Sequence, residues 1–127
     1  MGGNRPRCRS GLSCVQGRME RFMEPSILLF LWGQRSHGYE LIEKLKALGF
    51  EGTAADMATL YRTLRSLEED GMVVSRWEEG SQGPPRRVYE LTGDGEALLH
   101  NWVRAIQVQR ARLDRFIALY EERRLQN

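Results

Sequence analysis

A group of small polar and basic side chains lies on one face of a helix that the sequence predicts to begin near Asp56. Small side chains let a helix approach a surface closely, and arginine donates hydrogen bonds to phosphate oxygens and to base edges in the major groove. The N-terminus of the helix adds backbone donors for a phosphate. A solvated surface without a ligand is the plainer alternative. If the face binds duplex DNA, the expected contacts are Thr59, Tyr61, Arg62, Thr63, Arg65 and Ser66.

Three arginines form a second predicted contact with DNA. Residues 78–85 are rich in glycine and proline, which indicates a hairpin loop longer than a two-residue turn. Positive side chains beside such a loop suit the phosphate backbone or the minor groove. The expected contacts are Arg76, Arg86 and Arg87, although Glu78 and Glu79 weaken the positive character of that edge.

The elements that must position these side chains follow from the hydrophobic pattern. Apolar residues recur at helical spacing in three early segments, and polar and apolar residues alternate in the later of two short β-type segments. N-cap candidates at Asp56 and Thr92, and glycines at 49 and 71, mark helix ends. The sequence predicts helices from Glu24 to the break at 35–38, from Tyr39 to Leu48 and from Asp56 to Gly71, strands at 72–77 and 87–91, and a helix at 94–124.

Three short helices followed by a hairpin are the plan of a winged helix, in which the later helix of a helix-turn-helix enters the major groove. The predicted fold class is therefore mainly α with a small β-hairpin, a winged helix-turn-helix plus a long C-terminal dimerisation helix. The expected domains are a flexible basic tail at 1–21, a DNA-binding winged helix at 22–92 and a dimerisation helix at 93–127.

The last predicted helix is on the order of 45 Å long at ~1.5 Å per residue, more than a small domain can cover. Its apolar stripe steps by threes and fours, which is the a/d pattern of a coiled coil. Because an exposed apolar stripe normally packs against another chain, we expect a homodimer. Packing on the chain's own first helix would explain only the near end of the stripe. The expected interface is Leu99, Trp102, Ile106, Gln109, Leu113, Phe116 and Tyr120.

The charge of the 127-residue chain is modest and uneven. Its formal net charge is +2, and residues 1–21 hold five arginines and one glutamate, so this tail carries +4 and the remainder −2. The tail is either solvated or an arm that touches phosphates. Its two cysteines, Cys8 and Cys14, indicate free thiols rather than a disulfide framework or a metal site.

Several function classes are not expected. No apolar run reaches the roughly 20 residues of a membrane span, and no apolar segment follows the basic N-terminus as in a secretory signal, which favours the cytoplasm. No phosphate-binding glycine loop or serine–histidine–aspartate arrangement is recognisable, so we expect neither an enzyme nor a cofactor. His37 is expected to cap or pack at the start of the second helix.

Beyond these patterns, the chain from Phe22 to about Tyr120 resembles the PadR-like transcriptional regulators. The resemblance implies a dimeric repressor whose C-terminal helices pair, and the loop 51–55 departs from it by lacking a basic residue. The C-terminal segment with Trp102 and residues 116–120 is similar to the polyhydroxybutyrate-responsive repressor subgroup. The matching stretches are Pro25 to Leu29, His37 to Leu41, Thr59 to Arg62, Leu64, Leu67 to Glu69, Gly71, Met72, Arg86 to Thr92 and Gly95.

A repressor needs a signal, and the aromatic side chains suggest where one would bind. Trp32, Trp102 and Ile106 would line an apolar pocket at the dimer interface, where an apolar or polymeric ligand would change the spacing of two recognition helices. Such aromatic residues are more often plain interface core. The alternative function is a winged-helix protein-interaction module without specific DNA binding, which the −2 charge of the body favours and the arginine pattern opposes.

Overall fold

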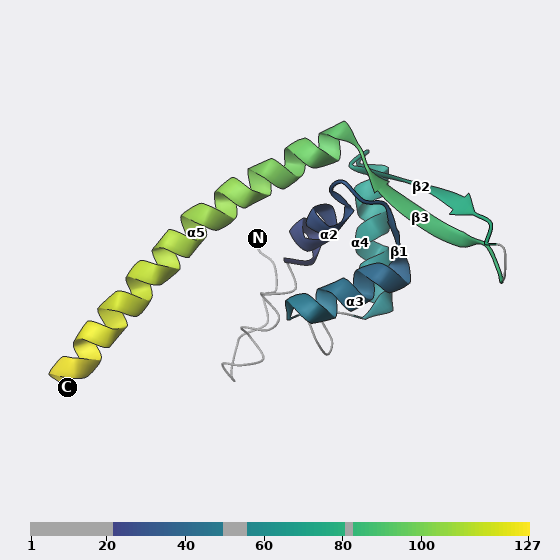
Figure 1. The fold of residues 1–127 in the computed structure, drawn as a ribbon. Coiled ribbons are helices and arrows are strands. Elements are labelled where there is room, and N and C mark those ends of the chain that lie inside the picture. Colours follow the sequence, from purple (N-terminus) through teal and green to yellow (C-terminus); the bar gives the residue numbers. More distant parts are fainter. Residues whose placement is uncertain (1–21, 50–55, 81–82) are drawn as a thin grey trace, which may run out of the picture.

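The computed structural model describes residues 22–49, 56–80 and 83–127. The predicted basic tail with both cysteines, and the loop 51–55, lie outside the described residues. Figure 1 shows the elements in chain order. They are α2 (Met23–Leu31), β1 (Ser36–His37), α3 (Gly38–Leu48), α4 (Met57–Glu69), β2 (Val73–Glu78), β3 (Arg86–Leu91) and α5 (Gly93–Gln126).

Helix α2 is the centre of the core. Most of its residues are apolar, and a helix that is apolar on nearly every side is stable where other elements surround it. Helix α2 packs against α3, α4, α5 and β3. Helices α3 and α4 are amphipathic and turn their leucine stripes towards α2. The fully buried side chains include Ile27, Leu28, Leu31, Leu41, Leu45, Leu60, Leu64 and Val73.

The predicted helix ends are confirmed by their capping geometry. The Asp56 carboxylate accepts a hydrogen bond of 2.7 Å from the backbone N–H of Thr59, and the Thr92 hydroxyl accepts one of 3.0 Å from that of Gly95. Gly49 ends α3 at φ 119°, a left-handed conformation that a side chain would disfavour. Local sequence chemistry therefore places both functional helices, α4 and α5.

The sheet has three strands rather than the predicted two. Strand β3 pairs antiparallel with β2 along its whole length, and β1 pairs with the other edge of β3 through Ser36↔Tyr89 and His37↔Val88. The segment 35–38, predicted as a break between helices, therefore includes the third strand. Two residues are too short to show a strand period, so only the pairing with β3 defines β1.

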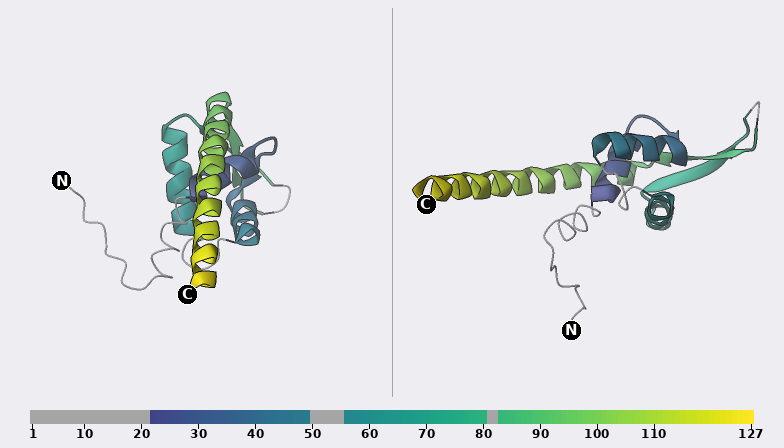
Figure 2. Two further views of the ribbon diagram at one scale, coloured as in Figure 1. Left: turned by 90° about the vertical axis from the view of Figure 1, so that its left-hand side faces the viewer. Right: turned by 90° about the horizontal axis from the view of Figure 1, so that it is seen from below.

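Helix α5 leaves the body on the side away from the β2–β3 hairpin (Figures 1 and 2). At 34 residues it is about 51 Å long. Its first turns pack on α2 and β3, and Leu99 is only 2% exposed. Every side chain after Ile106 is exposed. The predicted winged helix with a long C-terminal helix is confirmed as the fold.

Candidate nucleic-acid interface

Helix α4 presents a polar face that no other described element covers. The cap at Asp56 fixes where the helix starts, and three leucines, Leu60, Leu64 and Leu67, bury the inner face. On the outer face Arg62, Arg65 and Ser66 are exposed, while Thr59 is half-buried. Within the described part of the chain, neither of these two arginines forms an ion pair. Among the described residues, both guanidinium groups are therefore unpaired.

Two of the predicted contact residues on α4 also have partners within the chain. The Thr63 hydroxyl donates a 2.9 Å hydrogen bond to the Thr59 carbonyl oxygen, so it is turned towards the helix backbone. The Tyr61 ring lies against the start of α3, where a Cβ on residue 38 would collide with its hydroxyl end. Gly38 therefore makes room for Tyr61, which keeps 41% of its surface exposed.

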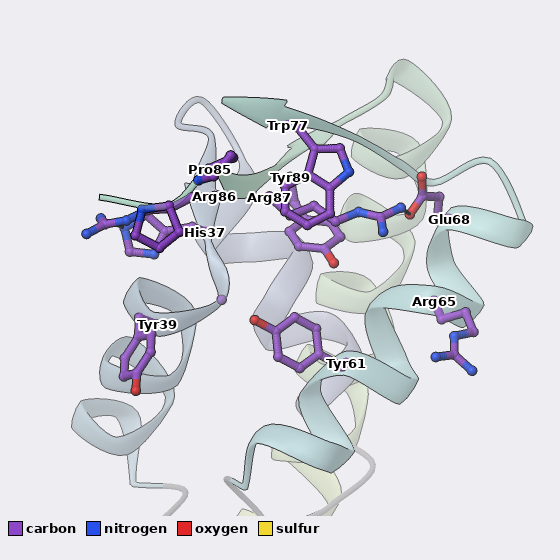
Figure 3. Close-up of a pocket in the computed structure, with 12 residues that line it drawn as sticks. His37, Tyr39, Tyr61, Arg65, Glu68, Trp77, Pro85, Arg86, Arg87 and Tyr89 are labelled. Atoms are coloured by element: carbon purple, nitrogen blue, oxygen red, sulfur yellow. Dashed lines mark hydrogen bonds and ion pairs between the residues drawn. The ribbon is translucent and has the colours of Figure 1, made fainter. Parts of the chain in front are cut away.

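A groove of about 630 Å³ separates α4 and the first turn of α3 from the hairpin (Figure 3). Aromatic rings and basic side chains supply most of its wall. Such a combination suits a sugar-phosphate strand, because rings pack on sugars or bases and guanidinium groups bind phosphates. The residues with these properties are Tyr39, Tyr61, Trp77, Tyr89, Arg65, Arg86 and Arg87.

The three arginines of the hairpin differ in their partners. Arg76 lies 3.7 Å from the Glu90 carboxylate, and Arg87 lies 3.5 Å from that of Glu68. Arg86 instead has its Nη1 3.2 Å from Nε2 of His37. Among the described residues, Arg86 is therefore the hairpin arginine without a carboxylate partner.

His37 is placed by both helix and sheet. Its backbone N–H donates a 3.2 Å hydrogen bond to the Glu40 carboxylate at the start of α3, in agreement with the predicted capping position. Its ring lies between Glu40, 3.4 Å away, and Arg86. One ring nitrogen, Nε2, therefore faces neighbours on both α3 and β3.

Two acid–base groups at the site have shifted pKa values. The hydrogen bonds from Thr59 lower the pKa of Asp56, so the cap of α4 stays ionised. Burial raises the pKa of the Tyr89 phenol, which lines the groove. Each shift strengthens the protonation state that the group already has at neutral pH.

The seven residues of the predicted dimer seam fall into two groups. Leu99 is in the chain's own core, Trp102 and Ile106 are half-buried, and the Trp102 indole N–H donates a 2.8 Å hydrogen bond to Glu24 on α2. The remaining four are exposed: Gln109, Leu113, Phe116 and Tyr120. Folding on α2 thus covers the near end of the seam, and a partner chain stays a prediction for its far end.

The three predicted effector residues are not brought together in one cavity of the described chain. Trp32 meets His100 edge-on, with ring centroids 5.3 Å apart. A cavity of about 460 Å³ beside Trp32 is lined by polar groups, including Arg35, Thr92 and Glu96. Neither Trp102 nor Ile106 lines it. The predicted effector pocket at a dimer interface therefore stays a prediction.

The predicted site leaves out three residues that lie in or beside the groove. Glu68 and Trp77 line the groove, and Ser75 contacts Arg87 beside it. Strand alternation is a sequence signal for Ser75 and Trp77, because residues two apart on β2 lie on the same face of the sheet as their pairing partners on β3. The contact with Glu68 could not be found in this way.

No cluster of three or more histidine, cysteine, aspartate or glutamate side chains in ranges 22–49, 56–80 and 83–127 could hold a metal ion. Among the helices described, none combines the length and apolar character required to cross a bilayer.

Known proteins resemble this chain in sequence. The model of the transcriptional regulator PadR-like family matches residues 27–101, more than half of the chain. A Mycobacterium tuberculosis protein named as a probable transcriptional regulator is 33% identical over 79 residues, which are 61% of this chain. The chain spans only 41% of that relative's length.

Solved structures share the fold. A PadR-like transcription factor from Bacteroides fragilis has a TM-score of 0.65 and 29% identity, over 80% of this chain and 97% of that one. A PadR family transcriptional regulator from Eggerthella lenta has a TM-score of 0.71 and 24% identity, over 84% and 91% of the two chains. The second likeness supports the fold alone.

Proposed function

The chain belongs to the PadR-like family of transcriptional regulators, which are not enzymes. We propose that it is a dimeric repressor of transcription. In this proposal α4 enters the major groove of duplex DNA, and the hairpin contacts the adjacent backbone as the wing. The observation that carries the proposal is the exposed polar face of α4. It lies beside the protein groove between α4 and the hairpin.

The individual contacts follow from exposure and charge. Arg62 and Arg65 reach base edges or phosphates, Thr59 and Ser66 approach the backbone, and Arg86 binds a phosphate at the wing. Tyr61 offers its hydroxyl at the rim of the groove. Arg76 keeps a surface ion pair with Glu90, which is weak enough to exchange for a phosphate.

Dimerisation is supported by the apolar surface that one chain leaves uncovered. Leu29 on α2 and Trp32, the residue that follows α2, are about half exposed, and Trp32 lies against His100 of α5. On α5 the exposed apolar residues are Val103, Val108, Leu113, Phe116, Ile117, Leu119, Tyr120 and Leu125. Pairing of two such helices buries this surface and holds two α4 helices at the roughly 34 Å spacing of successive major grooves.

The effector in this proposal is an apolar or polymeric ligand that binds at the dimer interface near Trp32, Trp102 and Ile106. Oligomers of 3-hydroxybutyrate are the first probe, because the C-terminal segment is similar to the polyhydroxybutyrate-responsive subgroup. We expect them to quench tryptophan fluorescence and to weaken operator binding together. If no such oligomer changes operator affinity, this effector class is excluded.

Footprinting of the purified chain on DNA beside its own gene tests the DNA-binding function. The affinity for a fluorescein-labelled duplex that carries the protected site should fall steeply with salt, because phosphate contacts release counterions. Weak binding with a flat salt response would instead favour a winged-helix module that binds protein.

Arg62→Ala tests the site itself. It should weaken specific binding by roughly 1–3 kcal/mol if Arg62 contacts a base. Arg115→Ala removes the same charge from an exposed position of α5 outside the predicted seam and is the matched control. Equal affinities for the two variants would remove Arg62 from the interface.

A further inference from the structure

We propose that Arg87 does not bind DNA but positions the wing, by tying β2 and β3 to the C-terminal half of α4 through Ser75 and Glu68. This inference rests on the proposed function, since positioning matters only if α4 and the wing bind one ligand together. It changes the expected role of Arg87 from a phosphate contact to an internal link between two DNA-binding elements.

Strand register brings the members of this link to one face of the sheet. Trp77 lies opposite Arg87, and Ser75 lies opposite Tyr89. Because side chains alternate between faces along a strand, these four residues share the face that looks onto α4. Arg86, the neighbour of Arg87 in sequence, points to the other side, towards His37.

The contacts of Arg87 form a connected set, of which Figure 3 shows Arg87, Glu68, Trp77 and Tyr89. Its Nε donates a 2.9 Å hydrogen bond to the Ser75 hydroxyl, which donates one of 2.8 Å to the Glu68 carboxylate. Its Nη2 lies 3.5 Å from the other oxygen of that carboxylate. The guanidinium also lies over the rings of Trp77 and Tyr89, at 5.8 Å and 6.0 Å from their centroids.

This set engages both the charge and the planar surface of Arg87. A guanidinium that lies near two ring faces and is hydrogen-bonded through its Nε has a preferred orientation, which the ammonium of lysine does not reproduce. A phosphate bound in a bidentate manner at the Nε and Nη2 edge would have to displace Ser75 and Glu68 and leave the Glu68 carboxylate without its cation. Arg86 has no carboxylate in contact among the described residues, so it is the better phosphate ligand.

The position of Glu68 explains what the link does. Glu68 follows Arg65 by three residues, which places it one turn further along α4 on a neighbouring part of the surface. The wing is thereby attached to the same helix that carries Arg62 and Arg65. In this proposal α4 and the wing already have a fixed separation before DNA binds. Less conformational entropy is therefore lost on binding.

The test compares Arg87→Met, Arg87→Lys and Glu68→Gln in the full chain, with the duplex that carries the footprinted site. Positioning predicts a loss of affinity of about tenfold for both Arg87 variants, with the salt slope unchanged. Glu68→Gln should also weaken DNA binding, because it removes the carboxylate that holds Arg87. If Glu68 only repelled DNA, the same substitution would strengthen binding. Arg86→Ala is the control for a phosphate contact and should lower the salt slope by about 1.

A second readout does not depend on DNA. Arg87→Met and Ser75→Ala should shift the indole N–H resonance of Trp77, identified with Trp77→Phe, and speed amide exchange in β2 and β3. Arg86→Ala should leave both unchanged. If the wild-type chain binds no duplex, the proposed function fails and this readout still decides whether the link exists.

Two results would overturn the proposal. One is a salt slope lowered by about 1 in Arg87→Met with the Trp77 resonance and amide exchange unchanged. The other is full affinity in Arg87→Lys, which would show that charge alone is required at this position.

Discussion

Helix α4 and the outer part of α5 carry similar apolar stripes with different surroundings. In α4 the stripe of Leu60, Leu64 and Leu67 is fully covered by the chain's own α2, α3 and sheet. In α5 the stripe continues past Ile106 with Leu113 and Phe116, which are more than half exposed. The difference teaches that an apolar stripe predicts burial but does not say which chain provides the cover.

The two helices also differ in how firmly their polar faces are positioned. On α4 the arginines point outward from a helix fixed on three sides, so their positions are defined before DNA binds. On α5 the helix itself projects from the body (Figure 2), and its orientation depends on what packs against it. Specific DNA recognition would use the first kind of surface, and a ligand-sensitive dimer spacing would use the second.

The largest expected effect comes from Leu64→Ala in α4. Leu64 is 0% exposed, and truncation of such a leucine should lower the free energy of unfolding by about 3 kcal/mol. Because the cover belongs to the same chain, this loss should not depend on protein concentration. Denaturant unfolding at several concentrations measures both quantities. A loss below about 1 kcal/mol would contradict the packing of α4.

The next effect is expected from the double variant Leu113→Ala and Phe116→Ala in α5. If a second chain covers these residues, the dissociation constant of the dimer should rise by about thirtyfold, equivalent to about 2 kcal/mol of lost apolar burial. Sedimentation at several concentrations measures it, and Arg115→Ala is the control. An unchanged association state would contradict the prediction that a second chain covers the outer stripe of α5.

Trp102→Phe probes the point where the two environments of α5 meet. The substitution removes the hydrogen bond from the indole to Glu24 and keeps an aromatic ring, so it should lower the stability of the body by about 1 kcal/mol. Tyr120→Phe removes a polar atom from the exposed end and should leave stability unchanged. Thermal unfolding of both variants separates the near end of α5 from the far end.

The smallest effect concerns the caps of the two helices. The pKa of Asp56 is lowered in the folded chain, so its ionised form adds stability above the ordinary carboxyl value of 3.8. This contribution is lost as the pH falls through the lowered pKa. Asp56→Asn still caps α4 but does not titrate, so its melting temperature should depend less on acid pH.

Thr92 provides the matched case on α5. Its hydroxyl caps the helix without titrating, so Thr92→Ser should leave the acid dependence of the melting temperature as in the wild type. If Asp56→Asn and the wild type lose stability in parallel down to about pH 2, the cap does not contribute to the acid response.

Much of the fold was predictable because its signals are local. The helix periods, the caps at Asp56 and Thr92 and the alternation in β3 all act within a few residues. Strand β1 was missed because a two-residue strand has no period, and its pairing partner is some fifty residues away. The polar face of α4 was also predictable, since it is the reverse of the leucine stripe.

The sequence by itself determined the order of elements, the side chains of the α4 face and the heptad steps of α5. Only the tertiary structure decided that Arg87 is tied to Glu68 while Arg86 meets His37, although the two arginines are adjacent. It also decided that Leu99 belongs to the core and Leu113 to the surface. The physical reason is that composition and spacing set what a side chain can contact, whereas strand register and helix docking determine which partner lies within reach.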